Sequence, residues 1–541
     1  MSAARGAPAL APGNDARFDL IVIGAGINGA AVAREAALRG ARVLLVERRD
    51  VGGGTSATSS RLIHGGLRYL EHAELGLVRE SLAERERLLA LAPHLVAPLP
   101  LCIPVYERSR RPLWQIRVGL WLYERLAGPK SLPPYAVLSR AALLEELPGL
   151  APEGLRGGAR YFDGQVAFPE RLVLENALDA VRHGATLATY TEVVGIRVRD
   201  GRVEGVDWRR GDGASGAAFA PVVVNAAGPW VDRVLGPLAE RPLIGGTKGS
   251  HLIVAPFPGA PRTGVYVEAA SDGRPFFILP WNGLYLIGTT DRRFTGDPGA
   301  VRIDADEVAY LCAETERVFP GAAPLRERVL YTHSGVRPLP YRPRGEEGAI
   351  TRRHHVRPHP GVRGLYSIVG GKLTTHRALA EDVLRRVAAE ARWARGESPT
   401  RDRPLPGALD AAAREELIAE LAARFGPARA RRLWHTYGGA ARDVAERARD
   451  PELAAAIGEP PSLLVAELLH ALESEWATTL ADVLQRRTML GLNARFGLDV
   501  APAAAAALRR LGIWDDARAE AELADYRALA ASARLEADAP G

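Results

Sequence analysis

The first apolar segments of the chain alternate between strand-like and helix-like patterns. Residues 18–23 form a short, mainly apolar run typical of a buried strand. Glycines interrupt 24–29, and small and apolar positions with helical spacing follow over 30–39, closed by Gly40. A second apolar run at 41–47 predicts another buried strand. These segments together predict a βαβ unit, the smallest part of a doubly wound α/β sheet.

Strand patterns recur far from this unit. We expect strands at 193–198, 203–208, 222–226, 251–254, 276–279, 285–288 and 365–369. The first two are expected to pair with each other. The segment from 236 to about 332 is rich in such patterns and interrupts the dinucleotide-binding region. It predicts an inserted substrate domain built on an antiparallel sheet.

Composition changes at both ends of the chain. Residues 1–16 are rich in Ala, Pro and Gly without hydrophobic periodicity, which is typical of a disordered tail. After a proline-containing linker at 401–407, Ala, Leu, Arg and Glu dominate with helical spacing. The predicted organisation is a tail at 1–16, an α/β region at 17–400 that carries the inserted domain, and a helical C-terminal domain at 401–541.

The charge and cysteine content narrow the class of protein only moderately. The net charge is +6 over 541 residues, and no block of five or six basic residues occurs, so we expect no nucleic-acid partner. Neither a secretory signal nor an apolar run of about 18 residues is present, which predicts no membrane span. Only Cys102 and Cys312 occur, and this favours a reducing, cytoplasmic compartment.

The glycine turn after the first strand matches a dinucleotide-binding motif. Gly24, Gly26 and Gly29 fit the spacing G-x-G-x-x-G, and Glu47 follows about twenty residues on, where an acid can accept the ribose hydroxyls. A second match at 211–216 has no helix behind it to face a phosphate, so we interpret it as a surface loop. The chain is therefore predicted to bind one dinucleotide.

Several further motifs carry a family resemblance. The segment 55–72 reads TSATSSRLIHGGLRYLEH, and other motifs lie at 224–230, 248–251, 287–291, 334–339 and 370–375. In this order they resemble the FAD-dependent, quinone-linked glycerol-3-phosphate dehydrogenases over about 18–381. We expect the small hydroxyl residues and the following Gly-Gly pair of the first motif to let the backbone lie against the flavin, because larger side chains would occupy the volume of the cofactor. The segment 163–171 is more weakly similar, and 478–490 resembles the family's helical cap loosely.

The resemblance implies FAD as cofactor and oxidation of sn-glycerol 3-phosphate to dihydroxyacetone phosphate, with electrons passed to a membrane quinone. It implies substrate contacts from Arg68, Arg337 and Lys372, with Arg352 as a weaker candidate. The implied cofactor contacts are Gly24, Gly26, Asn28, Gly29, Glu47, Arg48, Thr58, Ser59, Ser60, Leu62, His64, Val193, Ala226, Gly228, Gly371, Lys372, Leu373 and Thr374.

The residue types suit this chemistry. Arginine donates paired, charge-assisted hydrogen bonds to phosphate, and His64 is the candidate general base because imidazole titrates near neutral pH. Alternatively, His64 only hydrogen-bonds the flavin or the backbone. Arg337 and Lys372 are also assigned to catalysis, and either could instead balance the charge of the reduced flavin. We expect no metal at His354, His355 and His359, because basic neighbours would repel it.

Other functions remain open at this stage. A glycerol-3-phosphate oxidase would pass the electrons to oxygen and release peroxide. An enzyme of the amino-acid oxidase group would keep the FAD site and bind a carboxylate substrate. A flavin-containing RNA-modifying protein is suggested only by the basic charge. The oligomeric state, a homodimer included, is also left open.

The segment 110–130 predicts an amphipathic helix that is unusually apolar. Arg110, Arg117 and Glu124 recur at heptad spacing, while two tryptophans and several aliphatic side chains fill the remaining surface. Such a helix suits a membrane surface, where aromatic rings and cations are favoured. We therefore expect peripheral association with the inner face of the cell membrane. The alternative is a helix buried against the C-terminal domain.

Overall fold

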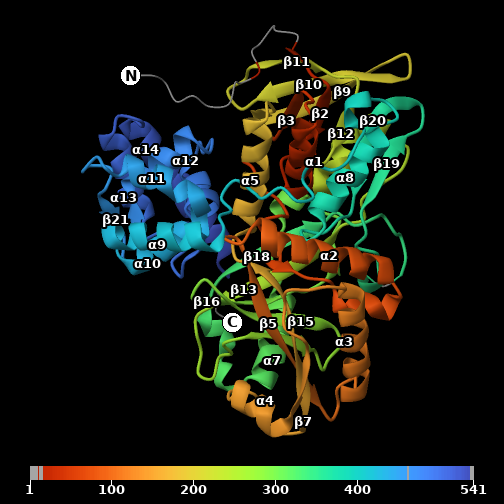
Figure 1. Cartoon of the computed structure of the whole chain (residues 1–541), viewed down its shortest axis with the longest axis vertical. Coiled ribbons are helices and arrows are strands. Elements are labelled where there is room, and N and C mark those ends of the chain that lie inside the picture. Colours follow the sequence, from red (N-terminus) through yellow and green to blue (C-terminus); the bar gives the residue numbers. More distant parts are fainter. Residues whose placement is uncertain (1–9, 11–15, 346, 460–461, 536–541) are drawn as a thin grey trace, which may run out of the picture.

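The computed structural model describes residues 10, 16–345, 347–459 and 462–535. The tail predicted at 1–16 lies outside these residues, apart from Leu10 and Ala16. Two large sheets lie one above the other along the long axis, and the C-terminal helices form a separate body beside the upper sheet (Figure 1).

The upper sheet contains the predicted βαβ unit, formed by β2 (Leu20–Ile23), α1 (Ile27–Leu38) and β3 (Val43–Val46). Together with β8 (Thr186–Ala188), β12 (Val223–Asn225) and β20 (Val362–Val369), these strands run parallel. Every residue of β2 and β3 is buried, because both faces of the sheet are covered. The doubly wound α/β fold is confirmed.

Each face of this sheet has its own cover. Helices α1, α5 (Pro169–Arg182) and α8 (His376–Val387) pack on one face. On the other face, side chains of β10 (Arg202–Arg210) and α6 (Val231–Leu235) complete the core. Strand β10 pairs with β9 (Thr191–Arg199) as predicted, and with β11 (Ser215–Phe219). The second glycine motif, 211–216, lies at the turn between β10 and β11, as expected for a surface loop.

The lower sheet is the predicted second domain, but it draws on more of the chain than 236–332. Six strands come from the expected part: β13 (Thr247–Val254), β14 (Gly264–Glu268), β15 (Pro275–Trp281), β16 (Leu284–Gly288), β17 (Arg292–Arg293) and β18 (Val329–Arg337). Four more lie upstream: β4 (Leu62–Ile63), β5 (Val96–Tyr106), β6 (Ala136–Ser139) and β7 (Leu155–Val166). The predicted boundary was therefore too narrow. Prolines in β5 and glycines in β7 interrupt the alternation of apolar and polar residues by which strands are identified in a sequence.

Helices cover both faces of the lower sheet. On one face lie α4 (Arg140–Glu146) and α7 (Ala305–Val318). On the other lie α2 (Leu75–Leu91) and α3 (Leu113–Ala127), together with part of the C-terminal domain. This sheet ends at β4, which lies within the flavin-binding motif predicted at 55–72.

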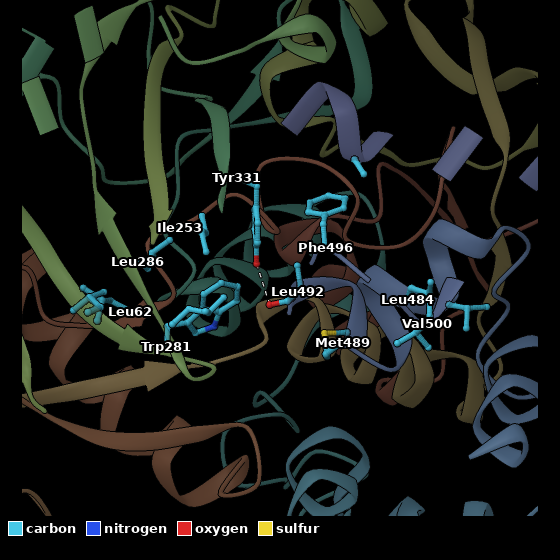
Figure 2. Close-up of a cluster of buried hydrophobic side chains, with 14 of the residues drawn as sticks. Leu62, Ile253, Trp281, Leu286, Tyr331, Leu484, Met489, Leu492, Phe496 and Val500 are labelled. Atoms are coloured by element: carbon cyan, nitrogen blue, oxygen red, sulfur yellow. Dashed lines mark hydrogen bonds between the residues drawn. The ribbon is translucent and has the colours of Figure 1, made fainter. Parts of the chain in front are cut away.

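The C-terminal domain is helical, as predicted. Its α-helices are α9 (Ala411–Phe425), α10 (Pro427–Tyr437), α11 (Ala441–Arg447), α12 (Val465–Glu473), α13 (Ala501–Arg510) and α14 (Asp516–Ala533). One hydrophobic cluster joins this domain to the lower sheet (Figure 2). In it Tyr331 of β18 packs against Phe496 and donates a hydrogen bond of 2.9 Å to the carbonyl oxygen of Leu492. The domain is thus packed directly against the lower sheet.

Buried charges provide a second connection between the C-terminal domain and the dinucleotide-binding region. Asp50, just after β3, accepts hydrogen bonds from Arg487 at 2.7 and 2.9 Å and from Arg486 at 2.6 Å. Asp50 and Arg487 are almost completely buried. Removing one partner of a buried ion pair leaves the other charge without compensation in a poorly polarisable environment.

We expect Asp50→Ala to lower the free energy of unfolding by about 3–5 kcal/mol, because Arg487 then loses its carboxylate partner inside the protein. Denaturant unfolding followed by tryptophan fluorescence measures this. Asp516→Ala removes a comparable but exposed ion pair with Arg509, and it should change the stability by at most about 0.5 kcal/mol. Equal effects of the two substitutions would contradict the structural role of Asp50.

Candidate active site

A cavity of about 540 Å³ opens at the carboxyl ends of the parallel strands. Its walls include Ile23 at the end of β2, Val46 at the end of β3 and Ala226 directly after β12. In open α/β sheets this edge is where ligands bind. From here the cavity continues towards the lower sheet, where Gly249, His251 and Gly335 line it.

The glycine turn gives the cavity its floor. Gly24 has φ +99°, and a Cβ atom there would lie 2.8 Å from the carbonyl oxygen of Ala226. A Cβ atom on Gly29 would lie 1.8 Å from the carbonyl oxygen of Gly24. Gly29 itself does not line the cavity, so its part in the motif is to bring α1 close to the turn. Helix α1 begins at Ile27, and its N-terminal dipole favours a phosphate there.

Glu47 and Asn28 present polar atoms suited to a dinucleotide. The Glu47 carboxylate accepts backbone hydrogen bonds from Ala25 at 2.8 Å and from Arg49 at 2.9 Å, which fix its orientation. Burial raises the pKa of Glu47 above its ordinary value. The Oδ1 atom of Asn28 is buried without a hydrogen-bond partner. An unsatisfied buried acceptor beside a glycine cradle fits a bound cofactor that donates to it.

The cavity brings most of the expected cofactor residues together. The following line it: Gly24, Gly26, Asn28, Glu47, Arg48, Thr58, Ser59, Ser60, Leu62, His64, Val193, Ala226, Gly228, Gly371, Lys372, Leu373 and Thr374. The exception is Gly29, described above. The sequence did not single out Trp230, whose ring lies 4.2 Å from the Arg48 guanidinium and lines the same end of the cavity.

The Gly-Gly pair of the flavin-binding motif has a different role from the one expected. Neither Gly65 nor Gly66 lines the cavity. A Cβ atom on Gly65 would lie 2.5 Å from the hydroxyl of Tyr123 and 2.5 Å from Leu82, and one on Gly66 would collide with the ring of Tyr69. Gly65 therefore allows the motif to pack against α2 and α3, and Gly66 leaves room for the ring of Tyr69. The hydroxyl residues at 55–60 line the cavity as expected, whereas the expectation that the Gly-Gly pair faces the flavin was wrong.

Two arginines line the end of the cavity away from the glycine turn. Arg337 donates to Asp291 at 3.1 Å and to Thr289 at 2.9 Å, and Arg352 donates to the other oxygen of Asp291 at 3.0 Å. Burial alone would raise the pKa of Asp291, but Arg337 and Arg352 hold it below its ordinary value. Arg274 lies 3.2 Å from the same carboxylate. One carboxylate thus faces three guanidinium groups, so positive charge is in excess here and suits an anionic ligand.

Lys372 lies on the same side. Its ammonium group donates to the carbonyl oxygen of His64 at 3.1 Å and to the hydroxyl of Ser81 at 3.0 Å, and it lies 4.8 Å from the centre of the Tyr69 ring. Burial lowers the pKa of Lys372 to about 7. The charge of this lysine therefore depends on its neighbours near neutral pH.

Two histidines line the cavity near these cations. His64 was expected, whereas His251 was present in a quoted motif but had no assigned role. Burial, with Lys372 close by, holds the pKa of His64 well below its ordinary value. Burial and Arg337 do the same for His251, whose Nε2 atom is 2.9 Å from the hydroxyl of Ser60. The expectation that His64 titrates near neutral pH was wrong. The sequence does not show that the fold buries this side chain close to cationic groups.

Arg68 is not among the residues that line the cavity. Its guanidinium lies beside Gly348, where a Cβ atom would be 2.3 Å from Nη2. The adjacent Tyr69 does line the cavity. Arg68 and Tyr69 are consecutive residues of the short 3-10 helix η1 (Leu67–His72) and therefore point in different directions, with Tyr69 directed into the cavity.

The three histidines at 354–359 have separate surroundings. His354 faces Asp382 at 3.5 Å, while His359 is 2.9 Å from the hydroxyl of Ser367. Within the part of the chain that the structure describes, no group of three or more His, Cys, Asp or Glu side chains is arranged to hold a metal ion.

Comparisons with known proteins agree with this geometry. Residues 19–386 match the family model described as FAD dependent oxidoreductase, and residues 398–519 match that of the C-terminal domain of alpha-glycerophosphate oxidase. A glycerol-3-phosphate dehydrogenase of Synechocystis is 44% identical over 88% of this chain and 89% of its own length. A D-erythritol 1-phosphate dehydrogenase of Brucella abortus is 39% identical over 87% and 94%, respectively.

A solved structure is similar over almost the whole chain. The glycerol-3-phosphate dehydrogenase of Bacillus halodurans, determined in complex with FAD, superposes with a TM-score of 0.76. It is 25% identical and covers 97% of both chains. The family-model matches, the curated relatives and this structure include both the dinucleotide-binding region and the helical C-terminal domain. The chain therefore belongs to the FAD-dependent oxidoreductases, within the glycerol-3-phosphate dehydrogenase family.

Proposed function

We propose that this enzyme oxidises sn-glycerol 3-phosphate to dihydroxyacetone phosphate and passes the electrons to a membrane quinone. The observation that carries the proposal is the combination within one cavity of a dinucleotide cradle and, at its far end, the cations Arg337, Arg352 and Lys372. A small phosphorylated alcohol matches a site of this size, polarity and charge.

The arginines have the geometry to anchor the substrate phosphate. Arg337 and Arg352 are held apart and oriented by the two oxygens of Asp291, so little side-chain freedom is lost when they bind an anion. Planar guanidinium groups donate paired hydrogen bonds to phosphate. Anchoring the phosphate would hold the neighbouring carbinol in a fixed orientation.

The remaining residues suit the redox step. When bound, FAD supplies the acceptor for the hydride that leaves the carbinol carbon. The hydroxyl proton passes to one of the two imidazoles, His64 or His251, which are both neutral at pH 7 because their pKa values lie well below 6.5. Lys372, when protonated, provides a positive charge beside them. Arg68 would contribute from the rim near Gly348 rather than inside the cavity.

The substrate assignment can be tested against two alternatives with an artificial, water-soluble electron acceptor. We expect the specificity constant for glycerol 3-phosphate to exceed that for D-erythritol 1-phosphate by at least about tenfold, equivalent to 1.4 kcal/mol. Glycine and other amino acids, which carry a carboxylate in place of the phosphate, should give no turnover. A preference for the erythritol phosphate or for an amino acid would overturn the assignment.

The proposed membrane contact is the outer face of α3. Trp114, Val118 and Trp121 share one side of this helix and are 68%, 55% and 52% exposed. Arg125 lies over Trp121 with its guanidinium 5.7 Å from the ring. An apolar stripe with an adjacent cation suits the headgroup boundary of a bilayer. Because quinones partition into lipid, a dehydrogenase that reduces them has to reach that boundary.

The alternative location for this helix, against the C-terminal domain, was wrong. Its inner residues Ile116, Leu120 and Tyr123 are buried, and the helix packs on α2, β7 and η1. The helix is therefore well anchored, and its tryptophans remain outside. Among the described residues, none of the helices combines the length and the apolar character needed to cross a bilayer.

A glycerol-3-phosphate oxidase is the second candidate, favoured by the match of the C-terminal region to a family model named after an oxidase. Both candidates share the substrate chemistry and differ in the acceptor. The number of peroxide molecules released per substrate molecule oxidised in air distinguishes them. A quinone-linked dehydrogenase releases well below one peroxide per substrate, and an oxidase releases one.

A further inference from the structure

A buried carboxylate behind the cavity wall joins α2, α3 and the flavin-binding motif. Asp163 of β7 is 1% exposed and does not itself line the cavity. It accepts hydrogen bonds from Arg85 of α2 at 2.7 Å and from the Tyr123 hydroxyl of α3 at 2.8 Å. The backbone N–H of Gly65, next to His64, lies 3.4 Å from the same carboxylate.

This arrangement connects the back of α3 to the flavin-binding motif. The outer side of α3 presents Trp114 and Trp121, whereas its inner residue Tyr123 reaches Asp163 and packs against Gly65. Any side chain on Gly65 would collide with the Tyr123 hydroxyl. The position of the segment that contains His64 is therefore defined by contacts with α3 as well as by the cavity.

Asp163 also dominates the charges around Lys372. The carboxylates that favour the charged form of Lys372 are Asp163, which has the largest effect, and then Glu80 and Glu74 at the start of α2. Arg352 disfavours the charged form. The ammonium group itself is bonded to Ser81 and to the carbonyl oxygen of His64, and the Tyr69 ring lies across from it. Lys372 and Asp163 are linked through the peptide group between His64 and Gly65, whose carbonyl oxygen accepts from Lys372 and whose N–H donates to Asp163. Arg85, which contacts Asp163 directly, is also bound by Glu86 at 2.8 Å.

We propose that Asp163 is a positioning residue for the redox reaction: it fixes the His64–Gly65 segment against α3 and supplies the main negative charge that keeps Lys372 cationic beside the substrate. It acts through Lys372 and touches neither substrate nor cofactor. The inference rests on the proposed oxidation of glycerol 3-phosphate. Nothing in the family resemblance assigns a role to this residue, which lies in the segment of weaker similarity at 163–171.

The direction of the effect follows from electrostatics. The pKa of Lys372, about 7, is the balance between burial, which lowers it, and nearby carboxylates, of which Asp163 has the largest raising effect. Without that carboxylate, the lysine would lose its proton at a lower pH. If the cation assists the reaction, the rate of flavin reduction falls as the pH rises through the pKa of Lys372, and in Asp163→Asn this fall should begin at a lower pH.

The test is the pH dependence of flavin reduction by glycerol 3-phosphate, measured anaerobically on FAD-containing enzyme. We expect Asp163→Asn to move the alkaline limb by about one pH unit towards acid, so that the rate at pH 8 drops about tenfold while the rate at pH 5.5 stays within threefold. At pH 8, where Lys372 of the variant is neutral, the reduction potential of the bound flavin should also fall. Glu86→Gln is the matched control, since it removes a carboxylate from the other side of Arg85 and should leave the limb unchanged.

Tyr123→Phe provides an independent variant that keeps the charge. Without the hydroxyl donor the Asp163 carboxylate attracts Lys372 more strongly, so the limb should move towards higher pH, opposite to Asp163→Asn. If Asp163→Asn does not retain FAD, the test rests on Tyr123→Phe. An alkaline limb that stays in place or moves towards lower pH in Tyr123→Phe overturns the proposal. A uniform loss at every pH in Asp163→Asn would show a merely structural role. Failure of the unmodified enzyme to be reduced by glycerol 3-phosphate would instead refute the proposed function.

Discussion

The Arg337→Ala enzyme is expected to bind FAD normally and to lose at least about 97% of its rate of flavin reduction by glycerol 3-phosphate. Arg337 is held by Asp291 and Thr289 at the cation-rich end of the cavity, away from the glycine turn. Truncating one partner of a buried charge–charge contact costs about 2–5 kcal/mol, and each 1.36 kcal/mol is tenfold in rate. Rapid-mixing absorbance at the flavin band measures the loss.

Two further variants define the specificity of this effect. Arg337→Lys retains the charge but not the planar pair of donors, so an intermediate rate is expected. Arg292→Ala removes a half-exposed arginine of strand β17, and the carboxylate of Asp306 lies 3.7 Å from this arginine. The flavin of this variant should be reduced by glycerol 3-phosphate at the unmodified rate. A reduction rate within threefold of normal in Arg337→Ala would exclude this residue from substrate binding.

The second large effect concerns the outer face of α3. We expect the unmodified enzyme to float with anionic vesicles and the Trp114→Glu, Trp121→Glu double variant to remain at the bottom of the gradient. Each apolar side chain transferred from water contributes about 2 kcal/mol, so two tryptophans account for roughly a thousandfold in partitioning. Flavin content and activity with a water-soluble acceptor should not change, whereas activity with quinone in vesicles should fall in parallel with binding.

The control for this experiment is another exposed apolar side chain. Ile513 lies between α13 and α14 of the C-terminal domain and is 41% exposed, so Ile513→Glu changes charge and surface polarity elsewhere on the molecule. It should float normally. If the unmodified enzyme does not float at low salt, delivery of electrons to the membrane is contradicted, and the oxidase alternative gains support.

Short sequence patterns predicted much of the fold and most of the residues that line the cavity. The glycines at 24–29 and the acid at 47 act over a short stretch of chain, since a tight turn and the start of a helix depend on neighbouring residues. The second domain was harder to delimit. Strands β5 and β7 pair over most of their length, but prolines and glycines replace the alternating pattern that would identify them.

The electrostatics of the site could not be predicted in the same way. Asp291 and Asp163 are far in sequence from the cations that they contact, because strand pairing and helix packing bring them together. The low pKa of His64 likewise results from burial near Lys372, which is about 300 positions away in the chain. His251 was overlooked because it occupies a fully buried strand, where a histidine is not distinguishable from a structural residue by sequence alone.

Anaerobic mixing of the oxidised enzyme with sn-glycerol 3-phosphate tests the central claim most directly. The account predicts that the flavin absorbance bleaches in a single turnover, with one dihydroxyacetone phosphate formed per FAD reduced. Flavin that stays oxidised with saturating glycerol 3-phosphate, in enzyme that contains FAD and is reducible by dithionite, would contradict it.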